Sequence, residues 1–116
     1  MKSFRHSLTR VAVQRGEWDV TVVVEGTQPL AYTIMPIDAF RLSMDLANMG
    51  TNLKFQELPV DHLLLSRIRI GRHPDKLRLV LDLNLALNKD LKYAVKARGN
   101  QLALRLVKIE QPVRDK

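Results

Sequence analysis

Arginine recurs in this chain at spacings that could bind carboxylates or phosphates. Arg67, Arg69 and Arg78 fall within one short stretch, and Arg105 follows further along the chain. A guanidinium is a planar fork of N–H donors, which can bond a carboxylate or phosphate through two parallel hydrogen bonds. We therefore take these four arginines as candidate ligand-binding residues that would hydrogen-bond acidic or glycan groups. The alternative is that these arginines bind no ligand and only keep a sheet face hydrated and protected from pairing with another strand.

The motif Arg-x-x-x-Asp occurs twice, as Arg41 to Asp45 and as Arg78 to Asp82. In a strand, residues four apart share a face but lie roughly 13 Å apart, at about 3.3 Å per residue. The two side chains of one motif therefore cannot meet. Any ion pair must form with a neighbouring strand, where such pairs are worth about 0.2–1 kcal/mol each.

No catalytic or metal-binding set is found in the sequence. The three histidines, His6, His62 and His73, lie near the terminus, in a connector and in a turn, and none has a metal-ligand spacing. We expect each of them to be exposed to solvent. The chain has no cysteine, glycine-rich phosphate loop, HExxH motif or carboxylate pair. We predict that it is not an enzyme and uses no metal or cofactor.

The candidate arginines must be positioned by strands, because apolar residues alternate with polar ones almost throughout. With 116 residues, 46% of them hydrophobic, the chain can bury a single core. The alternating runs are 8–13, 18–24, 30–34, 40–46, 68–70, 77–83, 91–95 and 102–106. Residues 47–65 are predicted to connect two halves, and 59–65 could hold a helical turn with Asp61 as its N-cap.

The second half of the chain repeats the first. Residues 8–13 match 65–70, so that Arg10 corresponds to Arg67, and further along Tyr32 corresponds to Tyr93. Each four-strand repeat is too small to bury its apolar face alone. The sequence therefore predicts an all-β fold, a small β-sandwich built from two pseudo-symmetric four-strand repeats.

The net charge of +7 belongs entirely to the second repeat. Residues 1–58 contain six Lys and Arg and six Asp and Glu, whereas residues 59–116 contain thirteen and six. Alternation places Arg67, Arg69 and Arg78 on the outside, with further cations outside on the strands that follow. These further cations are Lys92, Lys96 and Arg105. We therefore predict one basic sheet face.

A basic chain could also bind nucleic acid, but the aromatic residues argue against a single-strand platform. Proteins that bind single strands place aromatic side chains among basic ones on an exposed sheet face. Here Trp18, Tyr32 and Tyr93 share the predicted inward face. Binding of a nucleic-acid duplex is the least favoured of the alternatives, and it would depend steeply on salt.

The order of the strand motifs resembles the AMIN domain. The most specific parts are Ile-Arg-Ile-Gly at 68–71, Arg-Leu-Val-Leu-Asp-Leu at 78–83 and Arg-Leu-Ser-Met-Asp-Leu at 41–46. The resemblance covers roughly residues 7–108, which implies a single domain there with terminal tails at 1–6 and 109–116. Two loops depart from the family pattern, at residues 37–40 and at Arg72, where a glutamine is common.

The resemblance implies a non-catalytic, periplasmic β-sandwich of the kind found in N-acetylmuramoyl-L-alanine amidases and type IV pilus secretins. Such a module recognises peptidoglycan and localises its host protein within the cell envelope. The alternative is a protein-interaction module that docks onto pilus-secretin or cell-division envelope proteins. No apolar run reaches the roughly 18–20 residues of a membrane span, and the start lacks a signal peptide. An envelope location therefore implies a segment cut from a longer precursor.

Overall fold

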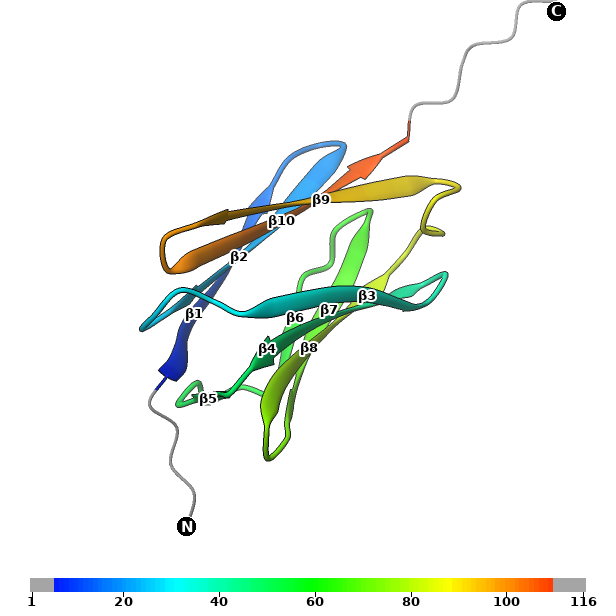
Figure 1. Cartoon of the computed structure of the whole chain (residues 1–116). Helices are drawn as coiled ribbons and strands as arrows, with labels where there is room; N and C mark the ends of the chain where they lie inside the picture. The colour runs from blue at the N-terminus through cyan, green and yellow to red at the C-terminus, as the bar shows by residue number, and fades with distance from the viewer. Residues whose placement is uncertain (1–5, 110–116) are drawn as a thin grey trace, which may run out of the picture.

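A computed structural model describes residues 6–109, which form ten strands and no helix (Figure 1). The strands are β1 (His6–Arg15), β2 (Asp19–Gly26), β3 (Tyr32–Asp38), β4 (Arg41–Ala47), β5 (Met49–Thr51), β6 (Glu57–Pro59), β7 (Leu65–Arg72), β8 (Lys76–Leu83), β9 (Leu91–Arg98) and β10 (Gln101–Lys108). Apart from His6 and Ile109, the predicted terminal tails lie outside the described residues.

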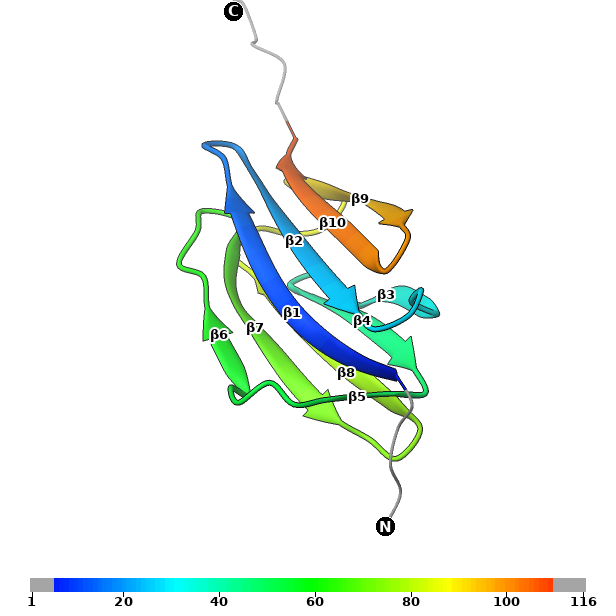
Figure 2. The ribbon, with the colours of Figure 1, turned by 90° about the vertical axis from the view of Figure 1, so that its left-hand side faces the viewer.

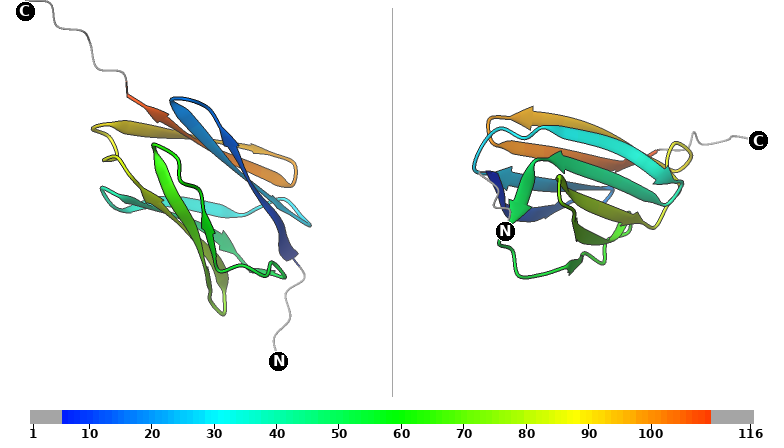
Figure 3. Two further views of the ribbon diagram at one scale, coloured as in Figure 1. Left: turned by 180° about the vertical axis from the view of Figure 1, so that it is seen from behind. Right: turned by 60° about the horizontal axis from the view of Figure 1, so that its bottom comes forward.

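The strands form two five-stranded sheets that pack face to face. Sheet A has the order β5-β1-β2-β10-β9, and sheet B has the order β3-β4-β8-β7-β6. Figure 3 shows the sheets as two layers. The predicted all-β sandwich is confirmed, but it has ten strands where eight were predicted. The two additional strands come from the predicted connector: β5 pairs parallel with β1, and β6 pairs antiparallel with β7.

The core lies between the sheets and is built by the alternating residues. The fully buried side chains of the central strands include Val20, Val22 and Val24 on β2, Leu77, Leu79 and Leu81 on β8, and Leu102, Leu104 and Leu106 on β10. Successive residues of a strand face opposite sides, so the residues between these point to the outer faces. The alternation that buries the leucines thus turns Arg78 and Arg105 outward.

Each sheet contains one hairpin from each repeat, so the two predicted four-strand units do not form separate sheets. The first repeat supplies β1 and β2 to sheet A and β3 and β4 to sheet B. The second repeat supplies β7 and β8 to sheet B and β9 and β10 to sheet A. Figure 2 shows β2 and β10 side by side in one layer, with β4 and β8 in the other.

The two sheets have equivalent strand orders, which agrees with the predicted pseudo-twofold axis. In each sheet a connector strand lies beside the first hairpin of one repeat, and the second hairpin of the other repeat follows. A register shift also occurs at the same place in both repeats, between Leu8 and Arg10 and between Leu65 and Arg67. The two repeats therefore share this irregularity of strand pairing as well as their sequence pattern.

Two of the aromatic residues are not where alternation placed them. Trp18 is 56% exposed, because β2 begins one residue later, and Lys108 lies 5.5 Å from its ring centroid. Tyr32 is 40% exposed, because β3 is an edge strand. Only Tyr93 packs against the core as predicted. The argument against a single-strand platform therefore loses two of its three residues. Phe40, the first residue of the predicted alternating run 40–46, is also exposed, since β4 begins after it.

Residues 59–65 form no helical turn. Asp61 has a φ of 54°, in the left-handed region, whereas an N-cap residue has an extended backbone. The segment is held by Arg15 at the end of β1, whose guanidinium donates to the carbonyl oxygens of Val60 and Asp61. These bonds replace the backbone hydrogen bonds that a helical turn would have supplied.

His62 is buried, contrary to the prediction that all three histidines are exposed. The Leu64 backbone N–H donates to its Nδ1 at 3.0 Å, and its Nε2 lies 2.7 Å from the Gly16 carbonyl oxygen. Since Nδ1 accepts a hydrogen bond, Nε2 is the nitrogen placed to donate to the Gly16 carbonyl. His73 is exposed as predicted, and His6 is half-buried. His62 thus fastens the connector to the β1–β2 turn.

Candidate binding face on sheet B

The outer face of sheet B carries three of the four candidate arginines. Arg67 and Arg69 lie on β7 on either side of the buried Ile68, and Arg78 lies on β8 between the buried Leu77 and Leu79. Asp82 lies opposite Arg67 in the strand register, and Val80 lies opposite Arg69. The face therefore carries polar side chains on β6, β7, β8 and β4, with the apolar Val80 among them.

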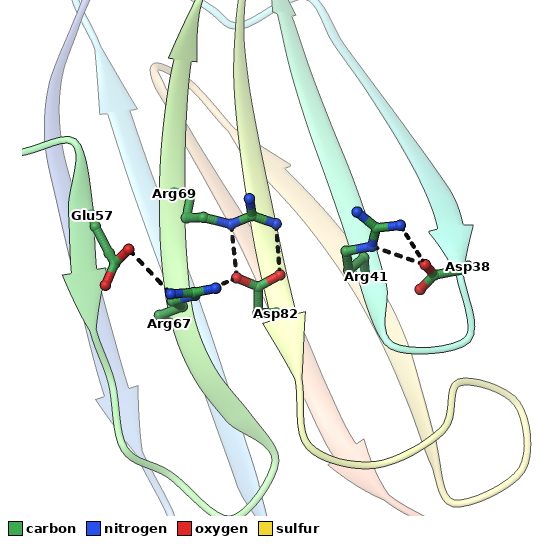
Figure 4. A network of polar contacts seen from close by, with 6 residues as sticks. All are labelled: Asp38, Arg41, Glu57, Arg67, Arg69 and Asp82. Carbon is green, nitrogen blue, oxygen red and sulfur yellow. Dashed lines mark hydrogen bonds and ion pairs between the residues drawn. The ribbon is translucent and has the colours of Figure 1, made fainter.

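Asp82 holds two of these arginines (Figure 4). Arg69 donates to both of its carboxylate oxygens, from Nε and from Nη2, each at 2.8 Å. Arg67 donates from Nε to the same carboxylate at 2.6 Å and reaches Glu57 on β6 at 3.3 Å. The two guanidinium groups are therefore fixed in orientation by charge-assisted hydrogen bonds.

Asp45 on β4 holds the third arginine. Arg78 donates to its two oxygens from Nε at 2.7 Å and from Nη2 at 2.9 Å, and Lys76 Nζ lies 3.5 Å away. In the register, Arg41 lies opposite Asp82 and Asp45 lies opposite Arg78. The two Arg-x-x-x-Asp motifs thus run antiparallel beside each other, and the prediction that their ion pairs are cross-strand is confirmed for Arg78.

Arg41 departs from this reciprocal pattern. Its Nε donates to Asp38 of the β3–β4 hairpin at 2.8 Å, and its Nη2 lies 2.7 Å from the same oxygen. Asp82, the residue across from it, bonds Arg67 and Arg69 instead. Figure 4 shows these as two separate groups of contacts.

The arginines lower the pKa of the carboxyl groups that they contact. For Asp45, the hydrogen bond from Arg78 is the largest cause, and it outweighs the opposing effect of burial. For Asp82, burial alone would raise the pKa, but the hydrogen bonds from Arg69 and Arg67 together bring it below the usual value. Both carboxylates are therefore charged at neutral pH.

A hollow of about 470 Å³ opens on this face between Arg69 and Arg78. Its lining residues are Gln56, Glu57, Arg69, Ile70, Gly71, His73, Arg78 and Val80. Gly71 leaves the space open because it has no side chain where β7 passes β8. Within residues 6–109, the Nη1 groups of Arg69 and Arg78 make no hydrogen bond. The hollow thus combines oriented N–H donors with amide and carboxylate acceptors.

The charges on this face nearly cancel. Its ion pairs involve five cations, Arg41, Arg67, Arg69, Lys76 and Arg78, and four carboxylates, Asp38, Asp45, Glu57 and Asp82. Arg105 lies on β10 in sheet A and bonds Asp19 at 2.9 Å, on the opposite face of the sandwich. The prediction of one basic sheet face is therefore wrong, because the hairpin exchange divides the cations of the second repeat between two sheets.

The outer edge of sheet A carries a row of cations without carboxylate partners among the described residues. Lys92, Lys96 and Arg98 are exposed along the edge strand β9, and none of them forms an ion pair with another described residue. The structure thus brings together Arg67, Arg69 and Arg78 but separates them from Arg105 and from these cations. Among residues 6–109, no group of three or more His, Asp or Glu side chains could hold a metal ion.

Sequence reasoning missed several residues of the hollow. Gln56 and Glu57 lie in the predicted connector, and His73 lies in a turn. Their proximity depends on β6 joining the edge of sheet B, which no local pattern indicates. Gly71 carried a usable signal, because a glycine within a strand often marks the close approach of a ligand or another backbone.

The family model of the AMIN domain matches residues 5–106. The chain belongs to the AMIN domain family. AMIN domains are non-catalytic and occur in periplasmic proteins, as peptidoglycan-targeting modules of amidases and secretins. A comparison with curated protein sequences returned no match. No helix in residues 6–109 is long and apolar enough to cross a membrane.

Proposed function

We propose that this AMIN domain binds peptidoglycan through the hollow on the outer face of sheet B and thereby localises its host protein in the periplasm. The observation that carries the proposal is the hollow itself, flanked by Arg69 and Arg78 and floored by Gly71. Peptidoglycan offers carboxylates on its stem peptides and hydroxyl and amide groups on its glycan. The lining provides partners for both kinds of group.

The paired arginines suit such a ligand better than free ones would. Asp82 and Asp45 each use two donors of one guanidinium and keep the plane of that group fixed. The remaining N–H groups are held ready, so a ligand need not order a mobile side chain when it binds. Because the charges of the face nearly cancel, binding would rest on hydrogen-bond geometry more than on net charge.

The proposed function involves no catalysis, and the module would act only by localising its host protein. Its host would be an amidase or a type IV pilus secretin, and the ligand would retain that host at the cell wall. Arg67 would contribute mainly by orienting Asp82, whereas Arg69 and Arg78 would contact the ligand. Arg105, on the other face, would not belong to this site.

A sedimentation assay with purified sacculi tests the proposal. We expect the wild-type chain to pellet with sacculi and the variant carrying Arg69→Ala and Arg78→Ala to remain in the supernatant. The matched control is Lys92→Ala with Lys96→Ala, which removes the same charge from sheet A and should leave retention unchanged. Circular dichroism melting of each variant checks that the fold persists.

The possible outcomes distinguish an error in the proposed ligand from an error in the proposed binding face. A wild-type chain that does not pellet would rule out peptidoglycan as the ligand. Retention that survives the double arginine substitution but is lost in the lysine control would assign binding to β9 instead. Equal loss in both double variants would indicate simple attraction between a basic protein and an anionic polymer.

A further inference from the structure

The edge strand β3 carries an unusual share of exposed apolar side chains. Six large hydrophobic residues in the described part of the chain are strongly exposed, and four of them lie on β3 or in the turn that follows. These four are Tyr32, Met35, Ile37 and Phe40, between 40% and 58% exposed. An apolar edge of this kind is a template for pairing with another strand.

The equivalent edge of the other sheet is lined with charged side chains, and this one is not. Lys92, Lys96 and Arg98 line β9, and charged side chains are a common device against edge pairing. In contrast, residues 27–37 contain no charged residue. Figures 1 and 2 place the β3 and β9 edges on the same side of the sandwich. The difference therefore lies between two edges related by the internal repeat.

The backbone of β3 fixes which polar groups are free. The Ala47 N–H donates to the Ala31 carbonyl at 2.9 Å, so alternate residues from Ala31 onward bond to β4. Thr33 therefore faces β4 with its backbone groups, whereas Tyr32 and Ile34 point theirs away from the sheet. Pro36, the next residue in this series, has no N–H to offer. The bonding edge is thus limited to Tyr32 and Ile34.

From this geometry we infer that β3 pairs antiparallel with β3 of a second copy of the chain, centred on Thr33. In this register Tyr32 lies opposite Ile34 of the second copy, and the two exchange both of their backbone hydrogen bonds. Symmetry repeats the exchange, so the backbone N–H and C=O groups of both Tyr32 and Ile34 are used. The pairing would join the two B sheets into one.

The side chains favour a second copy over an unrelated partner. The register makes two aromatic–β-branched pairs, Tyr32 with Ile34, and one Thr33–Thr33 pair, both of which stabilise antiparallel strands. No like charges meet, because the segment is uncharged. The strand is therefore complementary to itself in both its backbone and its side chains.

The absence of cysteine allows a direct test of the register. Thr33 would face its own copy in a non-hydrogen-bonded pair, where the Cα atoms approach to about 4.5 Å, close enough for a disulfide. We expect Thr33→Cys to oxidise to a covalent dimer at least about tenfold faster than Ala94→Cys, the matched position on β9. Equal rates for the two variants would overturn the proposal.

A second measurement uses the full chain without any thiol. Sedimentation from about 10 µM to 1 mM should reveal a monomer–dimer equilibrium in the range of weak interfaces. Ile34→Pro removes an outward N–H and should abolish the dimer, whereas Val95→Pro, which removes the equivalent N–H of β9, should not. A wild-type chain that stays monomeric, or a β3 that crosslinks only to a different envelope protein, would overturn self-pairing. Sacculus retention is read separately, so this result does not depend on the proposed ligand.

Discussion

The two outer faces of this domain differ in how they hold the cations of the second repeat. On sheet B, Arg69 and Arg78 each donate two hydrogen bonds to one carboxylate, which fixes the orientation of the guanidinium group. On sheet A, Lys92, Lys96 and Arg98 have no ion pair with another described residue. The face with most of the free charge is thus not the face with the built site. Unpaired cations attract anions in general. Arginines that are paired with carboxylates instead mark the place where N–H donors are held in a fixed orientation.

The sharpest way to test this contrast is to fill the hollow without changing its charge. A Cβ at Gly71 would meet only His73 Nε2 at 3.5 Å and the Arg78 carbonyl oxygen at 3.8 Å, which are ordinary contacts. Gly71→Leu should therefore fold, yet weaken sacculus retention by about a hundredfold, equivalent to about 2.8 kcal/mol. The control is Ala103→Leu on the outer face of sheet A, which should bind like the wild type. Full retention by the Gly71 variant would place the ligand elsewhere.

The carboxylates of the two faces should differ in their contribution to stability. Asp82→Asn removes the charge that holds Arg67 and Arg69, and we expect it to lower the free energy of unfolding by about 1–2 kcal/mol. Asp19→Asn weakens one exposed pair, with Arg105, and should cost less than about 1 kcal/mol. Urea denaturation followed by circular dichroism measures both. Equal losses would show that the network on sheet B is no stronger than an isolated surface pair.

Acid should weaken the network on sheet B through Asp45 and Asp82. Their pKa values lie below the unfolded value, so their stabilisation is present above about pH 4 and is lost as pH falls through the folded pKa values. The free energy of unfolding should therefore decrease below about pH 4 in the wild type. In the variant carrying Asp45→Asn and Asp82→Asn the decrease should be shallower. Parallel curves for the two proteins would contradict this assignment.

The free cations of β9 should govern only the weak, unspecific binding of polyanions. Any affinity for duplex DNA should fall with salt, and Lys92→Ala with Lys96→Ala should reduce the slope of log affinity against log salt by about 0.9 per cation removed. Arg69→Ala with Arg78→Ala should change it less, because both arginines are already neutralised by carboxylates. Fluorescence anisotropy across a salt series measures the slopes. A larger change in the arginine variant would reverse the comparison.

Eight of the ten strands and most of their inward-facing residues followed from the sequence, but the arrangement of the strands did not. Alternation identified the buried leucines of β8 and turned Arg67, Arg69 and Arg78 outward, because side-chain direction is a local property of a strand. Which sheet a strand joins depends on long-range pairing. The predicted basic face failed for that reason, since it assumed that strands close in sequence share a sheet.

The sequence does contain one signal of the strand arrangement. Two Arg-x-x-x-Asp motifs that cannot pair within their own strands suit each other when antiparallel, and this places β4 beside β8. Glu57 and His73 offered no comparable pattern, because they reach the hollow through a three-residue strand and a turn. His62 was misjudged because its burial comes from the backbone of another turn.

The exchange of hairpins makes the chain a tethered dimer of two half-domains. Neither half can complete a sheet alone, since the centre of each sheet joins β2 to β10 or β4 to β8, strands far apart in sequence. Folding must therefore close long loops before the central strands of either sheet can pair. This requirement is typical of slowly folding β-proteins. A cut between residues 52 and 56 should yield two fragments that are unstructured apart and restore the sandwich when mixed.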